Sequence, residues 1–199
     1  KKALIAAILV TVVTLVFTDN KPATDLAQIG LGVFLAAWVA AMMFKDWWTK
    51  ANRSSGLAIQ KINASYYGML TAHLGLAVTV IGVVLSSHLS VEKVIRLAPG
   101  QSDEVSGYEF HFDGIRNYVG ANYDSIEGQF RVTYDGETVA NLRPAKRQYH
   151  ASGQWMTEAG VDSNLWRDLY VAMGEKLPDS DDWAIRVYSK AFVMWLWIG

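Results

Sequence analysis

The feature that most constrains this chain is a long stretch without charge: no Asp, Glu, Lys or Arg occurs between Ile62 and Val91. A helix needs about 20 apolar residues to cross the hydrocarbon core of a bilayer, and this stretch exceeds that length. Two further apolar runs precede it, at Ala3–Phe17 and Leu26–Phe44. Successive apolar runs of this kind are typical of a membrane protein. We predict three transmembrane helices, at residues 1–18, 26–44 and 66–87.

The distribution of basic residues predicts how these helices are oriented. The loop at residues 45–65 contains four bases and one acid, whereas the short loop at residues 19–25 contains one base and two acids. By the positive-inside rule the longer loop is cytoplasmic and the shorter one faces outward. The third helix then ends on the outer face, which predicts an extracytoplasmic domain at residues 88–190. Residues 191–199 are predicted to begin a returning transmembrane helix.

The predicted outer domain has the alternating pattern of half-buried strands. Aromatic residues occupy every second position from Tyr108 to Phe112, which is the period of a strand. Asp135-Gly136 lies between two alternating runs and is a strong β-hairpin signal. The predicted fold class is therefore membrane α-helical with an inserted all-β domain, a small antiparallel barrel or sandwich of about six strands. We predict a short helical turn at Met156–Asp162.

The composition excludes several classes of function. From His88 to Gly199 there are 16 acids and 11 bases, and nucleic-acid binding normally needs a basic patch. The chain has no cysteine, which excludes disulfides, thiolate metal sites and thiol catalysis within it. It also lacks a hydrolase elbow, a phosphate-binding loop and a dinucleotide-binding fingerprint. A transport protein is disfavoured because no span carries a carboxylate or a broken apolar run.

His73 is the strongest candidate in this sequence for a residue that binds a metal or a cofactor. It lies inside the uncharged span, about seven residues, or roughly 10 Å along the helix axis, from the cytoplasmic end. Ionisable side chains at membrane depth are costly and usually face a protein interior or a cavity. A neutral imidazole is a common metal ligand, including the axial ligand of haem iron. Hydrogen bonding to a neighbouring helix is an equally good interpretation of the position alone.

A stripe of small residues follows the same predicted helix. Their spacing alternates between four and three, so they form one seam on its surface. Such a seam allows another helix, or a flat macrocycle, to approach the backbone closely. The members of this small-residue seam are Gly68, Ala72, Gly75, Thr79, Gly82 and Ser86.

Two other groups of residues are candidates for binding. Arg143, Lys146 and Arg147 form a basic cluster that could meet an acidic partner or haem propionates, although a solvated strand face is the favoured interpretation. The remaining histidines are not spaced like zinc ligands, and we predict that they are surface or rim residues. These histidines are His88, His111 and His150.

The segment Tyr67–Gly75 resembles the WGM-xx-(A/G)HLG helix of the CcmF family, the haem-lyase subunits of cytochrome c-type biogenesis. The similarity continues in order along the chain, is dense over residues 66–199, and is limited to hydropathy in the first two helices. The later motifs are Val91–Lys93, Gly107–Phe110, Asn122–Tyr123, Lys146–Tyr149, Met156–Ala159, Arg167–Tyr170, Trp183–Tyr188 and Phe192–Trp197.

The resemblance implies a part in attaching haem to apocytochrome c outside the bacterial cytoplasmic membrane. Family members receive substrate haem from the holo-CcmE haem chaperone and act together with CcmH and CcmI subunits. They also hold a haem b in the membrane between two transmembrane histidines, and His73 matches one of these axial ligands by motif. The alternatives are the paralogous haem lyase of nitrite reductase and a non-catalytic scaffold whose β-domain docks partner subunits.

Parts of the family pattern are absent from this chain, which we interpret as a piece of a longer protein. The tryptophan-rich haem-binding loop with its two flanking histidines and the second membrane histidine are among them. The resemblance therefore assigns no catalytic residue and no substrate-haem site to this chain. Ala191 stands where family members usually have proline, which loosens the turn into the last helix.

Overall fold

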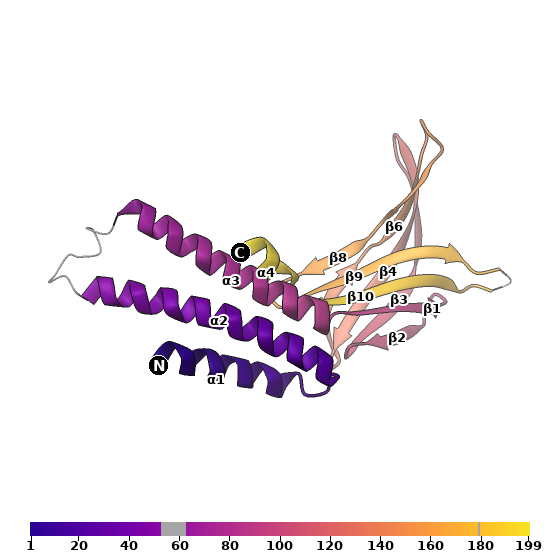
Figure 1. Cartoon of the computed structure of the whole chain (residues 1–199). Helices are drawn as coiled ribbons and strands as arrows, with labels where there is room; N and C mark the ends of the chain where they lie inside the picture. The colour runs from indigo at the N-terminus through magenta and orange to yellow at the C-terminus, as the bar shows by residue number, and fades with distance from the viewer. Residues whose placement is uncertain (53–62, 179) are drawn as a thin grey trace. The chain divides into compact units, whose positions relative to one another are not determined.

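The computed structural model describes residues 1–52, 63–178 and 180–199, so part of the predicted loop at 45–65 lies outside the described residues. The chain divides into two compact units (Figure 1). The helical unit contains Lys1–His88 and Phe192–Gly199, and the β unit contains Leu89–Ala191.

The described residues of the helical unit form α1 (Lys2–Phe17), α2 (Ala23–Asn52), α3 (Ala64–Leu89) and α4 (Val193–Ile198). Of these, α2 and α3 are long and apolar. By length and composition α2 and α3 can cross a membrane, and only 17% of the most apolar part of each is buried inside the protein. A helix that is apolar on all sides is typical of a membrane span or of the interior of a larger protein. The helices predicted at 26–44 and 66–87 lie within α2 and α3.

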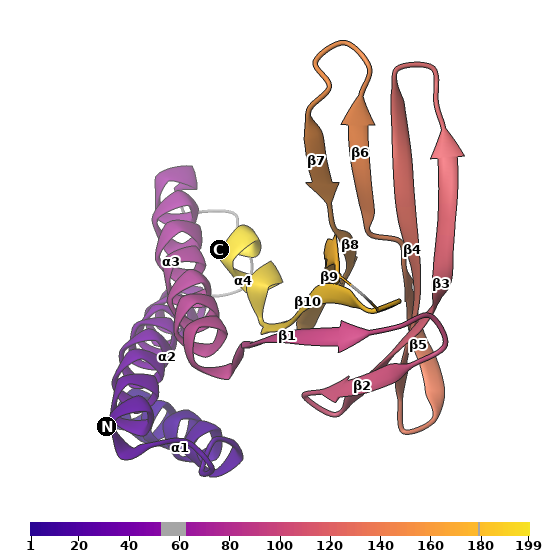
Figure 2. The same ribbon diagram turned by 90° about the vertical axis from the view of Figure 1, so that its right-hand side faces the viewer.

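The β unit consists of two antiparallel sheets. Sheet A contains β1 (Val91–Leu97), β10 (Trp183–Ala191), β9 (Arg167–Lys176) and β8 (Gly160–Ser163), in that order. Sheet B contains β2 (Ser102–Val105), β3 (Tyr108–Val119), β4 (Tyr123–Tyr134), β6 (Ala145–Tyr149) and β7 (Trp155–Glu158), in that order, and β5 (Glu137–Leu142) pairs with the end of β4. Figure 2 shows that the β3–β4 and β6–β7 hairpins run side by side.

The core of the β unit is formed by the inward faces of the two sheets. Phe110 and Phe112 of β3 are fully buried, as the alternation predicts. The ring of Phe112 stacks on Phe130 of β4 with centroids 4.7 Å apart. Sheet A contributes alternate residues of β9 and β10 to the same cluster. Period-two burial on both sheets confirms the predicted all-β domain, and the two separate sheets make it a sandwich.

The Asp135-Gly136 hairpin is also confirmed. These two residues connect β4 to β5, and their φ angles are 49° and 80°. Two successive residues with positive φ form the tight turn whose twist matches that of the flanking strands. Gly136 adopts this conformation without steric cost because it has no Cβ atom.

The predicted helical turn at Met156–Asp162 is wrong. The segment forms strands β7 and β8, and the chain passes from sheet B to sheet A between Glu158 and Gly160. A Cβ atom at Gly160 would lie 2.8 Å from the backbone nitrogen of Arg143, so the crossing requires glycine. The prediction of about six strands is also too low. Three of the strands, β2, β7 and β8, have only four residues each, and such short strands show little alternation of apolar and polar residues. Pairing with distant strands overrides local propensity there.

Candidate functional site

His73 presents an imidazole whose ring nitrogens have different roles. It is exposed on α3, and its Nδ1 lies 2.8 Å from the carbonyl oxygen of Met69, one turn earlier. A carbonyl oxygen can only accept, so we assign the proton to Nδ1, which donates this hydrogen bond. In the neutral imidazole Nε2 then keeps its lone pair. A ring N–H bonded to a backbone carbonyl is the arrangement that orients metal-binding histidines.

The side chains that lie next to His73 on its helix face are apolar. Within the described residues no three His, Cys, Asp or Glu side chains are grouped so that they could hold a metal ion. An axial haem ligand needs no such group, since the porphyrin itself would supply the in-plane ligands of the iron. Met69 and Leu76, four residues before and three after His73, are both exposed. They share its helix face and give the imidazole an apolar surround.

The small-residue seam lies on a different face of α3. At 3.6 residues per turn His73 is roughly 140° around the helix from the seam. The seam faces α4: a Cβ atom at Gly82 would lie 2.9 Å from Cδ1 of Leu196 and 3.0 Å from Cβ of Trp195. The sequence predicted that either another helix or a flat macrocycle approaches this seam. At Gly82 the structure shows the close packing of a helix.

Alanine at Gly82 and at Gly68 should therefore have opposite effects. At Gly82 the added methyl group meets α4, and such overpacking costs about 1–3 kcal/mol. At Gly68 a Cβ atom would have no neighbour within 4 Å, so Gly68→Ala should stabilise α3 by up to about 1 kcal/mol through helix propensity. Thermal unfolding of the whole protein in detergent measures both. Equal shifts of the same sign would contradict the packing of α4 on this seam.

Polar contacts join α2 and α3 near both of their ends. At one end Nδ1 of His88 lies 3.7 Å from a carboxylate oxygen of Asp25. At the other end the Tyr66 hydroxyl donates to the Asp46 carboxylate at 2.8 Å, and Lys50 donates to the same oxygen at 2.7 Å. His88 is thus a partly buried contact between helices near the end of α3, which agrees with a rim position.

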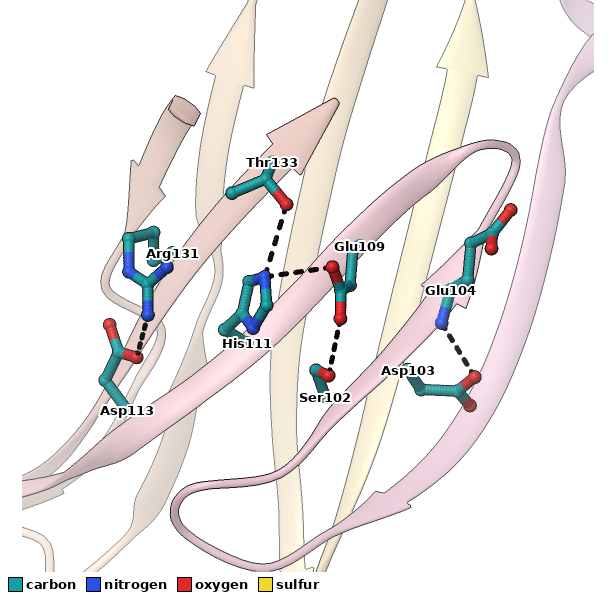
Figure 3. A network of polar contacts seen from close by, with 8 residues as sticks. All are labelled: Ser102, Asp103, Glu104, Glu109, His111, Asp113, Arg131 and Thr133. Atoms are coloured by element: carbon teal, nitrogen blue, oxygen red, sulfur yellow. Dashed lines mark hydrogen bonds and ion pairs between the residues drawn. The ribbon is translucent and has the colours of Figure 1, made fainter. Parts of the chain in front are cut away.

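The other two histidines lie in the β unit, where His150 is exposed and His111 is half-buried. Nε2 of His111 is 3.2 Å from both Glu109 and Thr133 (Figure 3). Ser102 donates to Glu109 at 2.7 Å and not to the imidazole. His150 lies 3.2 Å from a carboxylate oxygen of Asp124. Thr133 is buried, so the contacts of His111 lie partly inside the β unit, whereas the pair of His150 and Asp124 is exposed.

The basic cluster does not form one patch. Lys146 and Arg147 are neighbours on β6, so their side chains point to opposite faces of sheet B. Lys146 is only 8% exposed and pairs with Glu175 of sheet A. The Arg147 guanidinium stacks 4.8 Å from the ring centroid of Tyr123 and lies 3.5 Å from Glu158. A joint contact of this cluster with an acidic partner or with haem propionates is therefore not supported.

An ion pair between the two sheets should make the stability of the β unit depend on pH. Lys93 of β1 donates to both carboxylate oxygens of Asp103 of β2, at 2.9 and 3.0 Å, and this lowers the pKa of Asp103 below its ordinary value of 3.8. Because the folded-state pKa is depressed, the pair stabilises the fold above about pH 4 and this stabilisation is lost as the pH falls through the folded-state pKa. The pair is largely exposed, so its contribution is about 0.2–1 kcal/mol.

Replacement of Lys93 by methionine tests this dependence. The variant should be less stable than the original protein at pH 7 and equally stable once Asp103 is protonated. Denaturant unfolding of the β unit within the whole protein, measured between pH 7 and pH 3, gives both values. A difference in stability that stays constant over this range would contradict the assignment.

Known proteins resemble this chain in sequence and in fold. The family model described as the CcmF C-terminal beta-sandwich matches residues 88–191. Cytochrome c-type biogenesis protein CcmF of Pseudomonas aeruginosa is 46% identical over 171 residues, which cover 85% of this chain and 26% of that protein. The protein of the same name from Escherichia coli is 38% identical over 173 residues, 87% of this chain and 26% of that protein.

A solved structure shares the fold of the whole chain. It is described as Cytochrome c Heme Lyase CcmF and aligns with a TM-score of 0.76 and 19% identity over 98% of this chain and 31% of that one. The chain thus spans about a quarter of the length of the curated relatives that it matches. On the match of the family model to more than half of its residues, the chain belongs to the CcmF family of cytochrome c-type biogenesis proteins.

Proposed function

We propose that this chain is the part of a cytochrome c haem-ligation subunit in which His73 is an axial ligand of a haem b inside the bacterial cytoplasmic membrane. The observation that carries the proposal is the fixed imidazole of His73. Its Nδ1 proton is bound by the Met69 carbonyl at 2.8 Å, and its Nε2 lone pair is left for iron. The second axial ligand would come from outside this chain.

The residues of α3 would prepare this site in two ways. The Met69 carbonyl holds the proton on Nδ1 and so fixes the tautomer and the ring orientation. The exposed side chains of Met69 and Leu76 would cover the macrocycle and exclude water from it. When bound, haem b supplies one-electron redox chemistry, and the protein's contribution is to position and tune it.

The β unit would act on the outer side of the membrane. Substrate haem from a CcmE-type chaperone would be transferred there to apocytochrome c, with CcmH- and CcmI-type subunits as partners. The excess of basic residues over the sequence 45–65 supports this orientation under the positive-inside rule. The ends of the β3–β4 and β6–β7 hairpins expose Tyr118, Val119 and Trp155, which are side chains that partner subunits commonly cover. A purely scaffolding role would use this surface without haem at His73.

The absorbance of the whole purified protein tests the proposal. A reduced-minus-oxidised difference spectrum should contain the bands of a low-spin b-type haem, and pyridine extraction should release protohaem without thioether links. A protein that is folded and assembled with its partners but carries no such haem would contradict ligation at His73 and favour the scaffold.

A further inference from the structure

The two turns that flank β9 differ in chemistry. The turn between β8 and β9 exposes two large apolar side chains, Leu165 at 52% and Trp166 at 61%. The turn between β9 and β10, at the other end of sheet A, carries Asp181 and Asp182. Asp181 pairs there with Lys176 at 2.8 Å. One end of the sheet is therefore apolar at its tip, while the opposite end is acidic and suited to water.

The strand register places the apolar turn at the end of sheet A where the chain passes to the helical unit. Arg167, the first residue of β9, pairs with Ala191, the last residue of β10, and Val91 of β1 pairs with Ser189 of β10. Helix α3 ends at Leu89 and helix α4 begins at Val193, so only one residue separates each helix from its strand. The backbone N–H of Ala191 donates to the Ser90 hydroxyl at 3.2 Å. This hydrogen bond links the chain segment just before β1 to the last residue of β10.

The apolar turn is held in a fixed shape by its own polar groups. The Asn164 side-chain oxygen accepts hydrogen bonds from the backbone N–H groups of Trp166 and Arg167, at 2.8 and 2.9 Å. The Arg167 guanidinium donates to the backbone carbonyl of Asp162 at 3.2 Å and also pairs with its carboxylate. Because the tip is already ordered, little conformational entropy is lost when it binds a surface.

We propose that the Leu165–Trp166 tip inserts into the lipid–water interface of the membrane that α2 and α3 cross, and so anchors the β unit to the bilayer surface. A tryptophan ring has an apolar body and a polar N–H, and such rings concentrate at the headgroup level of membranes. The occupant of this surface is therefore phospholipid. The inference rests on the proposed membrane topology.

Site-directed spin labelling of the whole protein tests this anchor. The chain has no cysteine, so a nitroxide can be attached at Leu165→Cys alone, with the protein in nanodiscs of phosphatidylethanolamine and phosphatidylglycerol. Collisions with oxygen, which is enriched in lipid, should exceed those with a water-soluble nickel chelate. The matched control is Ser180→Cys in the turn at the other end of β9, roughly 30 Å away along the strand. Its label should show the reverse ratio.

Two outcomes at Leu165 would overturn the anchor. A label that is as open to the nickel chelate as the one at Ser180 would place the tip in water. A label closed to both reagents would place the tip against protein. If Leu165→Cys protein does not assemble, the label is attached at Trp166→Cys with the same expected readings.

A third label separates this inference from the topology on which it rests. Leu35 is exposed on α2, and a nitroxide at Leu35→Cys should report the hydrocarbon core. Lipid contact at Leu35 without lipid contact at Leu165 would overturn the anchor alone. Water contact at Leu35 would overturn the membrane topology and the anchor together.

Discussion

Replacement of His73 by alanine is expected to remove the b-type haem spectrum of the whole protein while the fold is retained. The side chain is exposed within the described part of the chain, and substitutions at exposed positions usually change stability by less than about 0.5 kcal/mol. Loss of an axial ligand has a larger effect on haem, since each 1.4 kcal/mol of binding free energy is about a factor of ten in affinity. We expect bound haem to fall below about a tenth of its original amount, measured by difference spectra at equal protein concentration.

Two further variants separate ligation from helix packing. His88→Ala removes a histidine from the same helix whose partner is Asp25, and it should leave the haem spectrum unchanged. In His73→Gly, added imidazole should restore a six-coordinate spectrum because the free ligand can occupy the space of the lost ring. If His73→Ala keeps the full haem spectrum, the histidine packs against a neighbouring segment and does not bind iron.

Replacement of Phe112 by alanine is expected to have the largest effect on the stability of the β unit. The ring is fully buried and stacks on Phe130 at an interplanar angle of 8°. Truncation of a buried phenylalanine costs about 3–5 kcal/mol, because transfer free energy is lost and a cavity remains. That is a large fraction of the roughly 5–15 kcal/mol by which domains are stable. Hydrogen exchange of the β3 and β4 amides in the whole protein measures the change.

Val119→Ala is the matched control on the same strand. Val119 is 79% exposed at the end of β3, and its truncation should change the free energy of unfolding by less than about 0.5 kcal/mol. Similar protection of the amides in the two variants would show that the stacked pair is not the centre of the core.

Features that depend on neighbours in sequence could be predicted. The uncharged stretch from Ile62 to Val91 predicts a long apolar helix, and α3 occupies most of it. The aromatic alternation from Tyr108 to Phe112 and the Asp135-Gly136 hairpin also appear where they were expected. Strand periodicity alone would have separated Lys146 from Arg147, since adjacent residues on a strand face opposite sides. Treating them as one basic cluster neglected that signal.

The residues of the candidate site also fall into those that the sequence could identify and those that it could not. His73 could be identified from sequence because it is a titratable residue in an apolar run that matches a family motif. Its angular separation from the small-residue seam follows from helical geometry and was missed, because spacing was considered only within the seam. The contact of Gly82 with Leu196 could not be predicted, because 114 positions separate the two residues along the chain.

The sequence by itself determined the membrane-type helices, most of the strands and the histidine within α3, because charge, period and turn chemistry act over a few residues. Only the tertiary structure decided that β7 and β8 belong to different sheets, that the seam meets α4, and that the Leu165–Trp166 turn lies beside the ends of β1 and β10. The physical reason is that strand register and helix contacts are selected by packing between segments far apart in the chain, and no local pattern specifies that choice.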